Sequence, residues 1–254
     1  MNGAQAVFYR DYRQRITNKT LVIWDLLAPL AYLLLFGSGF ERMMGGTIQL
    51  DGQLFGYTDF LVSGVITMVT YSVAMNSSWS FFTDKESGIA QELLTYPITR
   101  EQILIGKIGF NIATVLLGSI AVIVVAATLL DASVRWERLP LLAAVTVVST
   151  GGWFFVFSAF AIVLTRMDVF YASTSAAFLI SMFFSSMFYP LHDLPRWFQV
   201  VSYLNPLTWQ SDLSRFALLG IGEQNSLMYE AGALVVFCTG CLIFAVRSLN
   251  RADG

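Results

Sequence analysis

Few side chains in this sequence could carry out chemistry, and their spacing argues against catalysis. The single histidine, His192, has no partner set for a histidine-paired nucleophile, so we expect an interfacial residue there. Cys238 and Cys241 have the CxxC spacing of redox and metal sites, but they lie in an apolar stretch without further ligands. Small residues that pack against a neighbouring helix are the simpler interpretation of this pair. We expect no catalytic residues, no metal ligands and no cofactor bound by this chain.

Gly106 and Lys107 are the residues that come nearest to a phosphate-binding motif. A P-loop requires G-x-x-x-x-G-K followed by serine or threonine, so that backbone amides cradle the phosphates. Position 101 is Glu101 and Ile108 follows Lys107, so the motif is absent. The sequence therefore predicts that any ATP hydrolysis linked to this chain is supplied by another polypeptide.

The composition indicates which elements must position these residues. Of the 254 residues, 56% are apolar and 13% are charged, whereas soluble domains have about 25% charged residues. A helix needs about 20 apolar residues to cross the hydrocarbon core of a bilayer. Six stretches qualify: Leu21–Phe40, Phe60–Phe82, Ile103–Leu130, Leu141–Leu164, Val169–Tyr189 and Met228–Val246. We predict an all-α membrane protein with six transmembrane helices in a single domain, residues 1–254.

The longest polar connection, Thr83–Lys107, lies between the second and third predicted spans. Its apolar residues are spaced to line one face of a short helix: Ile89, Leu93, Leu94 and Ile98. Thr83 and Thr99 each stand three residues before Glu or Gln, the capping-box arrangement of a helix start. Pro97 separates the two starts, because the residue before a proline resists helical geometry. We expect a short helix in residues 83–102 on which something outside the membrane docks.

Residues 1–20 precede the first span and lack the apolar run and cleavage site of a signal peptide. Within Ala4–Lys19, apolar and polar side chains fall on opposite helical faces, as in a helix that lies in the interfacial plane. The apolar face comprises Ala4, Val7, Phe8, Tyr12 and Ile16, and the polar face comprises Arg10, Arg13, Gln14 and Thr17. A solvated basic tail is the alternative interpretation.

The distribution of basic residues predicts the orientation of the chain. With the amino terminus in the cytoplasm, ten Lys and Arg residues lie inside and five lie outside. Both termini and Thr83–Lys107 then face the cytosol. The net charge of −2 gives no reason to expect a nucleic-acid partner.

Residues 190–225 contain two apolar runs, Pro195–Leu204 and Leu207–Leu219, each too short to span a bilayer. Asn205 can cap the second run, and Pro206 can take its first helical position, where a missing amide costs nothing. Runs as apolar as these need shelter from water. We therefore predict two helices that are half-inserted into the outer leaflet.

A few polar residues near the predicted spans have foreseeable roles. Asp212 and Arg215 are three residues apart and can pair on one helix, although Glu230 is a rival partner for Arg215. Asp25 lies so near the cytosolic end of its span that an interfacial position is expected rather than a buried proton carrier. Asn76 is suited to hydrogen bonding between helices.

Two groups of motifs together resemble the permeases of type-2 ATP-binding-cassette (ABC) exporters. The loop after the second span carries the first group: Glu86-x-Gly88, Glu92-Leu93-Leu94, Pro97 and Arg100 before a Gly-Lys helix start. The segment before the last span carries the second: Tyr189-Pro190, Leu194-Pro195-x-Trp197, Asn205-Pro206-Leu207-Thr208 and Arg215. The resemblance covers the whole chain in the family's order of elements, and it is nearest to nodulation-factor and daunorubicin-type exporters.

The resemblance implies roles for particular residues. It implies a coupling helix that docks on the ATPase subunit through Glu86, Gly88, Ile89, Glu92, Leu93, Leu94 and Pro97. The interfacial helix would brace the same subunit, with Phe8, Arg10, Tyr12 and Arg13 on it. The outer helices would shape an exit gate with Pro195, Trp197, Asn205, Pro206, Trp209 and Arg215.

The same resemblance implies an assembly in the bacterial inner membrane, with two copies of this chain and two ATPase subunits that bind ATP and Mg. The first and fifth spans of each copy would form the seam, which carries an amphipathic, lipid-linked or glycan cargo. The chain itself would be a transport subunit and not an enzyme. The alternatives are a membrane-embedded enzyme that modifies lipid or glycan, and a passive channel subunit.

Overall fold

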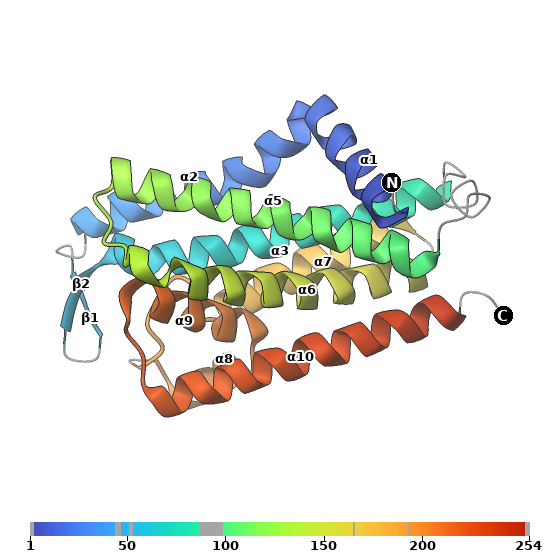
Figure 1. Cartoon of the computed structure of the whole chain (residues 1–254). Helices are drawn as coiled ribbons and strands as arrows, with labels where there is room; N and C mark the ends of the chain where they lie inside the picture. The colour runs from blue at the N-terminus through green and yellow to red at the C-terminus, as the bar shows by residue number, and fades with distance from the viewer. Residues whose placement is uncertain are drawn as a thin grey trace.

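A computed structural model describes residues 3–43, 47–50, 53–86, 99–164, 166–192 and 194–251. In this part the chain is a helical bundle with one short hairpin (Figure 1). The helices are α1 (Gly3–Thr17), α2 (Lys19–Met43), α3 (Tyr57–Glu86), α5 (Arg100–Leu129), η1 (Trp136–Arg138), α6 (Leu139–Val163), α7 (Met167–Phe183), α8 (Arg196–Tyr203), α9 (Pro206–Leu219) and α10 (Gln224–Arg251). The strands β1 (Thr47–Leu50) and β2 (Gln53–Gly56) pair antiparallel, with Thr47 opposite Gly56. The predicted all-α class is therefore correct except for this hairpin.

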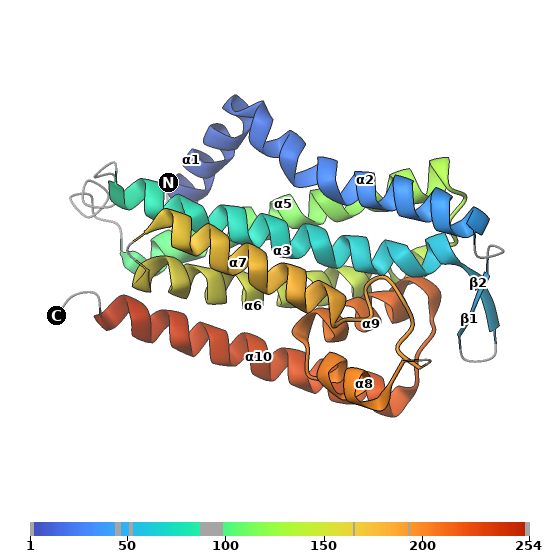
Figure 2. The same ribbon diagram turned by 180° about the vertical axis from the view of Figure 1, so that it is seen from behind.

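The long helices run along one axis, and α1 crosses them at an angle (Figure 1). Both marked termini lie at one end of the bundle, near α1 and the start of α5; we call this the charged end. The hairpin, α8 and α9 lie at the opposite end, the hairpin end (Figure 2). Helix α3 is the centre of the bundle, because 83% of its most apolar stretch is buried within the chain, whereas α10 buries 22%.

Within the described residues, four helices are long and apolar enough to cross a membrane: α3, α5, α6 and α10. Helices α2 and α7 contain shorter apolar stretches, Asp25–Gly39 and Met167–Phe183. The outward faces of these helices are apolar, with Leu35, Leu117 and Val236 each about 70% exposed. A bundle that is apolar on its outside and satisfies its backbone within helices is suited to lipid.

Helix α7 is shorter than the predicted span Val169–Tyr189, because it ends at Phe183. The Ser185 hydroxyl donates to the Met182 carbonyl oxygen at 2.7 Å and so turns back on the last helical turn. The side-chain amide of Asn205 donates to the carbonyl oxygens of Ser181 and Phe184 at 2.6 and 2.7 Å. These bonds satisfy carbonyls that a continuing helix would have used, which explains the early end.

The predicted helix start at Thr83 was wrong, because α3 continues without a break to Glu86. The polar residues of its last turns have partners on other helices, so α3 continues past its apolar part. The predicted capping box at Thr99 is confirmed. The Thr99 hydroxyl accepts from the Gln102 amide at 3.3 Å, and the Gln102 side chain accepts from the Thr99 amide at 3.2 Å.

The predicted break at Asn205-Pro206 is also confirmed. The Asn205 carbonyl oxygen Oδ1 accepts from the Leu207 amide at 3.0 Å, and Pro206 is the first residue of α9. The Asn205 side chain therefore has two roles: it caps α9, and it binds the end of α7.

We expect Asn205→Ala to lower the free energy of unfolding by about 2 kcal/mol, because it removes a cap and two buried hydrogen bonds. Asn205→Ser keeps a capping oxygen for the Leu207 amide and removes the side-chain amide that binds the two carbonyl oxygens, so about half of the loss should remain. The measurement is thermal unfolding of the purified chain in detergent. Equal losses in the two variants would show that the cap itself contributes nothing.

Candidate functional site

At the charged end, α1 lies directly against the first turns of α5. A Cβ atom on Gly106 would lie 2.6 Å from the Ala4 carbonyl oxygen and 2.8 Å from the Val7 Cβ atom, so only glycine permits this approach. The Phe8 and Phe110 rings then meet edge to face, 5.8 Å between centroids. The predicted helix is thus confirmed, and the face that packs within the chain carries Val7, Asp11 and Arg15, whereas Tyr12 and Ile16 of the predicted apolar face are exposed. Its position in the interfacial plane stays a prediction.

Four charged residues, three of them buried and Arg10 half-buried, join α1 to the end of α3 and the start of α5. Arg10 Nη2 lies 2.9 Å from both Asp11 Oδ1 and Asp84 Oδ2. Lys107 Nζ lies 3.0 Å from Asp84 Oδ2 and 3.8 Å from Asp11 Oδ2, and it donates to the Ser80 hydroxyl at 2.6 Å. The side chain of Lys107 is only 2% exposed. The two cations and two anions balance, so we call these four residues the charge quartet.

A second ionic contact continues from the quartet along α1. Arg15 forms an ion pair with Asp25 of α2, and Asp25 Oδ1 accepts from the Asn76 side-chain amide of α3 at 2.7 Å. Asp25, which was expected at the interface, is therefore enclosed between α1 and α3. The bond from Asn76 confirms the predicted hydrogen bonding between helices. Four helices, α1, α2, α3 and α5, are consequently joined through polar side chains.

The pKa values of Arg10 and Arg15 on α1 shift in opposite directions. Burial alone would lower the pKa of Arg10, but the carboxylates of Asp11 and Asp84 and their hydrogen bonds raise it above its ordinary value. Burial lowers the pKa of Arg15 to about 10, a fall that the Asp11 carboxylate offsets only in part. Both guanidinium groups remain protonated at neutral pH, so the ion pairs persist there.

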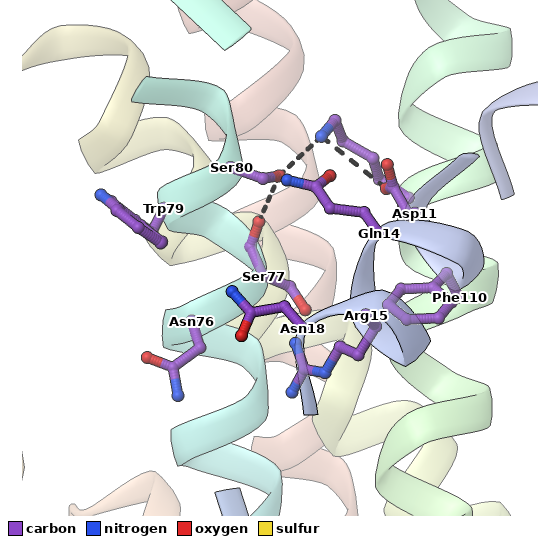
Figure 3. Close-up of a pocket in the computed structure, with 10 residues that line it drawn as sticks. Asp11, Gln14, Arg15, Asn18, Asn76, Ser77, Trp79, Ser80 and Phe110 are labelled. Atoms are coloured by element: carbon purple, nitrogen blue, oxygen red, sulfur yellow. Dashed lines mark hydrogen bonds and ion pairs between the residues drawn. The ribbon is translucent and has the colours of Figure 1, made fainter. Parts of the chain in front are cut away.

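A cavity of about 160 Å³, with mostly polar residues around it, lies beside this cluster (Figure 3). Gln14 and Arg15 approach it from α1, Asn18 from the junction between α1 and α2, and Asn76 and Ser77 from α3. In the described part of the chain there is no group of three or more His, Cys, Asp or Glu residues that could hold a metal. What the cluster provides is ion pairs between side chains of α1, α2, α3 and α5, and these pairs hold the four helices in position.

The cluster also adjoins the segment in which docking residues were predicted. Glu86 ends α3 and Arg100 begins α5. Two of the three helices that carry the quartet, α3 and α5, therefore flank residues 87–98. The side chain of Glu86 and all of Gly88, Ile89, Glu92, Leu93, Leu94 and Pro97 lie outside the described residues. Their predicted role in docking therefore stays a prediction.

Comparison with known proteins decides the family. The model of the family described as "ABC-2 type transporter" matches residues 3–219, which is most of the chain. This chain belongs to the ABC-2 type transporter family. The resemblance that the two groups of motifs suggested is therefore confirmed.

Two relatives support this assignment along nearly the whole permease. The inner membrane transport permease YadH of Escherichia coli is 28% identical over 236 residues, which cover 91% of this chain and 90% of YadH. Nodulation protein J of Sinorhizobium fredii is also 28% identical over 236 residues, 91% of this chain and 86% of the relative. With its apolar helices, the chain is a multi-pass membrane subunit of this transport permease family.

The predicted interfacial residues of the permease divide between two faces of α1. Tyr12 is 46% exposed, Arg13 is exposed, and the guanidinium of Arg13 lies 6.0 Å from the centre of the Tyr9 ring. Arg10, which was expected on the polar face, is half-buried, because it pairs with Asp84 of α3 in the quartet. Phe8 packs inward on Phe110.

Sequence reasoning missed Asp11, Asp84 and Lys107 as a linked group. The signal available was the i, i+4 spacing of Val7, Asp11 and Arg15, which are the three buried residues of α1. The partners on α3 and α5 carried no comparable signal. Arg10 and Asp84 are separated by 74 residues, so only packing brings them together.

The predicted gate residues of the permease lie at the hairpin end (Figure 2), with unequal burial. Pro195 precedes α8, on which Trp197 is 63% exposed. Trp209 of α9 is 9% exposed, and its indole donates to the Tyr203 carbonyl oxygen at 2.7 Å. The exposed apolar face of α8 fits the predicted half-inserted helix. Helix α9 is instead buried almost throughout, against α3, α6 and α10. The half-insertion of the two helices into the outer leaflet stays a prediction.

The predicted pair of Asp212 and Arg215 is confirmed. Arg215 Nη1 binds Asp212 Oδ1, Nη2 donates to the Ser186 carbonyl oxygen at 2.7 Å, and the guanidinium lies 3.7 Å from the centre of the Phe60 ring. Glu230, the rival partner, is buried nearby and accepts from the Ser226 hydroxyl at 3.0 Å. Arg215 thus fixes α9 to α3 and to the segment after α7.

A second buried network was missed by sequence reasoning. The Gln210 side chain of α9 accepts from the Trp153 indole at 3.1 Å and donates to the Thr70 hydroxyl at 2.9 Å. Gln210 and Thr70 are fully buried. This network joins α9 to α6 and α3 near the middle of the bundle, so the hairpin end is tied to the same central helix as the charged end.

Proposed function

We propose that this chain is the membrane-spanning subunit of an ATP-driven exporter. Two copies and two ATPase subunits form the assembly, and the ATPases bind ATP and Mg. The chain crosses the bacterial inner membrane six times, with both termini in the cytoplasm. The charged end then faces the ATPases, and the hairpin end faces outward.

The observation that carries this proposal is the charge quartet beside residues 87–98. Because α1, α3 and α5 are joined by buried ion pairs, a force applied between Glu86 and Arg100 is passed to three helices together. α3 then extends this connection to α9 through Thr70 and Gln210. Movement of a docked ATPase can in this way reach the opposite end of the bundle.

An aromatic cavity supports the proposed seam and the amphipathic character of the cargo. It has a volume of about 370 Å³ and lies between α2, α7 and the segment that follows α7. Tyr32 and Phe36 of α2 stack with ring centroids 5.3 Å apart, and Phe183 of α7 lies on the other side. The neighbouring surface of α2 exposes Leu27 and Leu35. Apolar surface with a few phenol groups suits a cargo with both apolar and polar parts.

The test is co-purification of the ATPase subunit with a docking variant, Glu86→Arg with Leu93→Asp. The charge reversal at Glu86 and the charge introduced by Leu93→Asp should remove the partner, while the variant still inserts and dimerises. The matched control makes the same changes at the hairpin end, Glu137→Arg with Leu54→Asp, at two exposed positions. We expect the control to retain the ATPase at the wild-type level.

An ATPase that stays bound to the docking variant, with undiminished coupled transport, would overturn the proposal. Loss of the ATPase from both variants would also contradict it, because the docking surface would then not be specific to the charged end.

A further inference from the structure

A cavity of about 320 Å³ opens between α9 and the start of α10. Both of these elements lie at the hairpin end (Figure 2). The rim of the cavity is formed by exposed side chains, among them His192, Tyr203 and Glu223. Its inner wall is formed by buried side chains, of which Arg215 and Glu230 are ionisable. The cavity is therefore accessible at the surface and has ionisable groups at its base.

The Arg215 guanidinium at the base of this cavity uses both of its Nη atoms within the chain, whereas Nε has no hydrogen-bond partner among the described residues. Asp212 pairs with Arg215 and also accepts from the Ser186 hydroxyl at 2.6 Å. The other face of the guanidinium is covered by the Phe60 ring at 3.7 Å, and Nη2 is bound to the Ser186 carbonyl oxygen. Arg215 and Asp212 thus neutralise each other, which leaves little positive charge for an anionic ligand.

The second carboxylate at the base lacks such compensation. Glu230 is 2% exposed, and its Oε1 atom accepts from the Ser226 hydroxyl at 3.0 Å. Its Oε2 atom is buried and has no hydrogen-bond partner among the described residues. A buried carboxylate oxygen without a partner is costly, so a donor that reaches Oε2 would stabilise the folded chain. Glu223 on the rim adds a further negative charge.

We propose that this cavity binds an ammonium group, which donates to Glu230 Oε2. A primary ammonium fits because it brings a positive charge and several donors to a site with an excess of carboxylate. The phenol ring of Tyr203 at the rim offers an aromatic face to the same cation. Two sources present this chemistry: an amine-bearing solute, such as a cargo with an amino group, and the headgroup of an aminophospholipid. Binding to the isolated chain does not depend on the proposed transport function.

The experiment measures the melting temperature of the purified full chain without its ATPase. In the first arm, the protein in lipid-free detergent is titrated with ethanolamine, and ethylene glycol serves as the neutral probe. In the second arm, the protein is placed in phosphatidylethanolamine nanodiscs or in phosphatidylglycerol nanodiscs. Glu230→Gln keeps the shape of the side chain and removes its charge, and Glu137→Gln removes an exposed carboxylate outside the cavity.

We expect at least one amine to raise the melting temperature of the wild type and of Glu137→Gln. In Glu230→Gln the half-saturating concentration should rise at least about tenfold, because a charge-assisted hydrogen bond is lost. A rise in the first arm without one in the second identifies a soluble amine as the source, and a rise in the phosphatidylethanolamine nanodiscs identifies the lipid. No rise in either arm would overturn the proposal, as would equal effects of ethanolamine and ethylene glycol or an unchanged response of Glu230→Gln.

Discussion

Lys107→Met is expected to lower the free energy of unfolding by about 3–5 kcal/mol, the typical cost of removing one partner from a buried ion pair. Methionine fills the space of the lysine side chain, so the loss is electrostatic. Asp11 and Asp84 would then share Arg10 alone, which leaves one negative charge uncompensated in a site where Lys107 is 2% exposed. Thermal unfolding of the purified chain in detergent measures the loss.

The double variant Asp84→Asn with Lys107→Met provides the decisive comparison. It restores charge balance, since Arg10 and Asp11 remain paired, and most of the lost stability should return. Arg166→Met is the matched control, because the side chains of Arg166 and Asp168 are 72% and 64% exposed, and no measurable change is expected there. A double variant that is less stable than Lys107→Met would contradict the idea of a charge-balanced quartet.

Gly64→Ala is expected to lower the free energy of unfolding by about 3 kcal/mol, through overpacking and the loss of buried hydrogen bonds. A Cβ atom at Gly64 would lie 2.2 Å from the Met187 carbonyl oxygen, a backbone atom that cannot rotate away. The segment after α7 must therefore move from α3. This movement would break the bonds from Tyr57 to the Phe188 carbonyl oxygen and from Arg215 to the Ser186 carbonyl oxygen.

Gly232→Ala tests whether the loss at Gly64 comes from this contact. A Cβ atom at Gly232 has nothing within 4 Å, and alanine favours helix over glycine by about 1 kcal/mol, so this variant should be as stable as the wild type or more stable. Both variants are measured by thermal unfolding. If Gly64→Ala matched Gly232→Ala, the close packing of α3 on the segment after α7 would be disproved.

Several local features of the permease follow from the order of its residues. The break at Asn205-Pro206 and the capping box at Thr99 could be predicted, because a cap involves residues two or three positions apart. The pair of Asp212 and Arg215 could be predicted for the same reason. The capping-box pattern at Thr83 misled the prediction, because α3 continues through it to Glu86. The polar residues of these last turns bind side chains of α1 and α5.

The roles of the charged residues required the fold. Sequence spacing placed Arg10 on the polar face of α1. Its partner Asp84 lies 74 residues away, so the spacing within α1 could not reveal this ion pair. The donor for Asp25 is Asn76, 51 residues away, and Gln210 reaches Thr70 across 140 residues. No local pattern encodes such distances.

The sequence by itself determined that the chain is helical, resides in a membrane, and has its main helix breaks and family motifs where they are. These properties depend on the apolar content of each stretch and on contacts within a helical turn. Only the tertiary structure decided that α1 is joined to α3 and α5 by the quartet, and that Glu230 faces a cavity without a partner for Oε2 in the described residues. The physical reason is that the energy of a charge depends on its partners and on its burial, and helices distant in sequence set both.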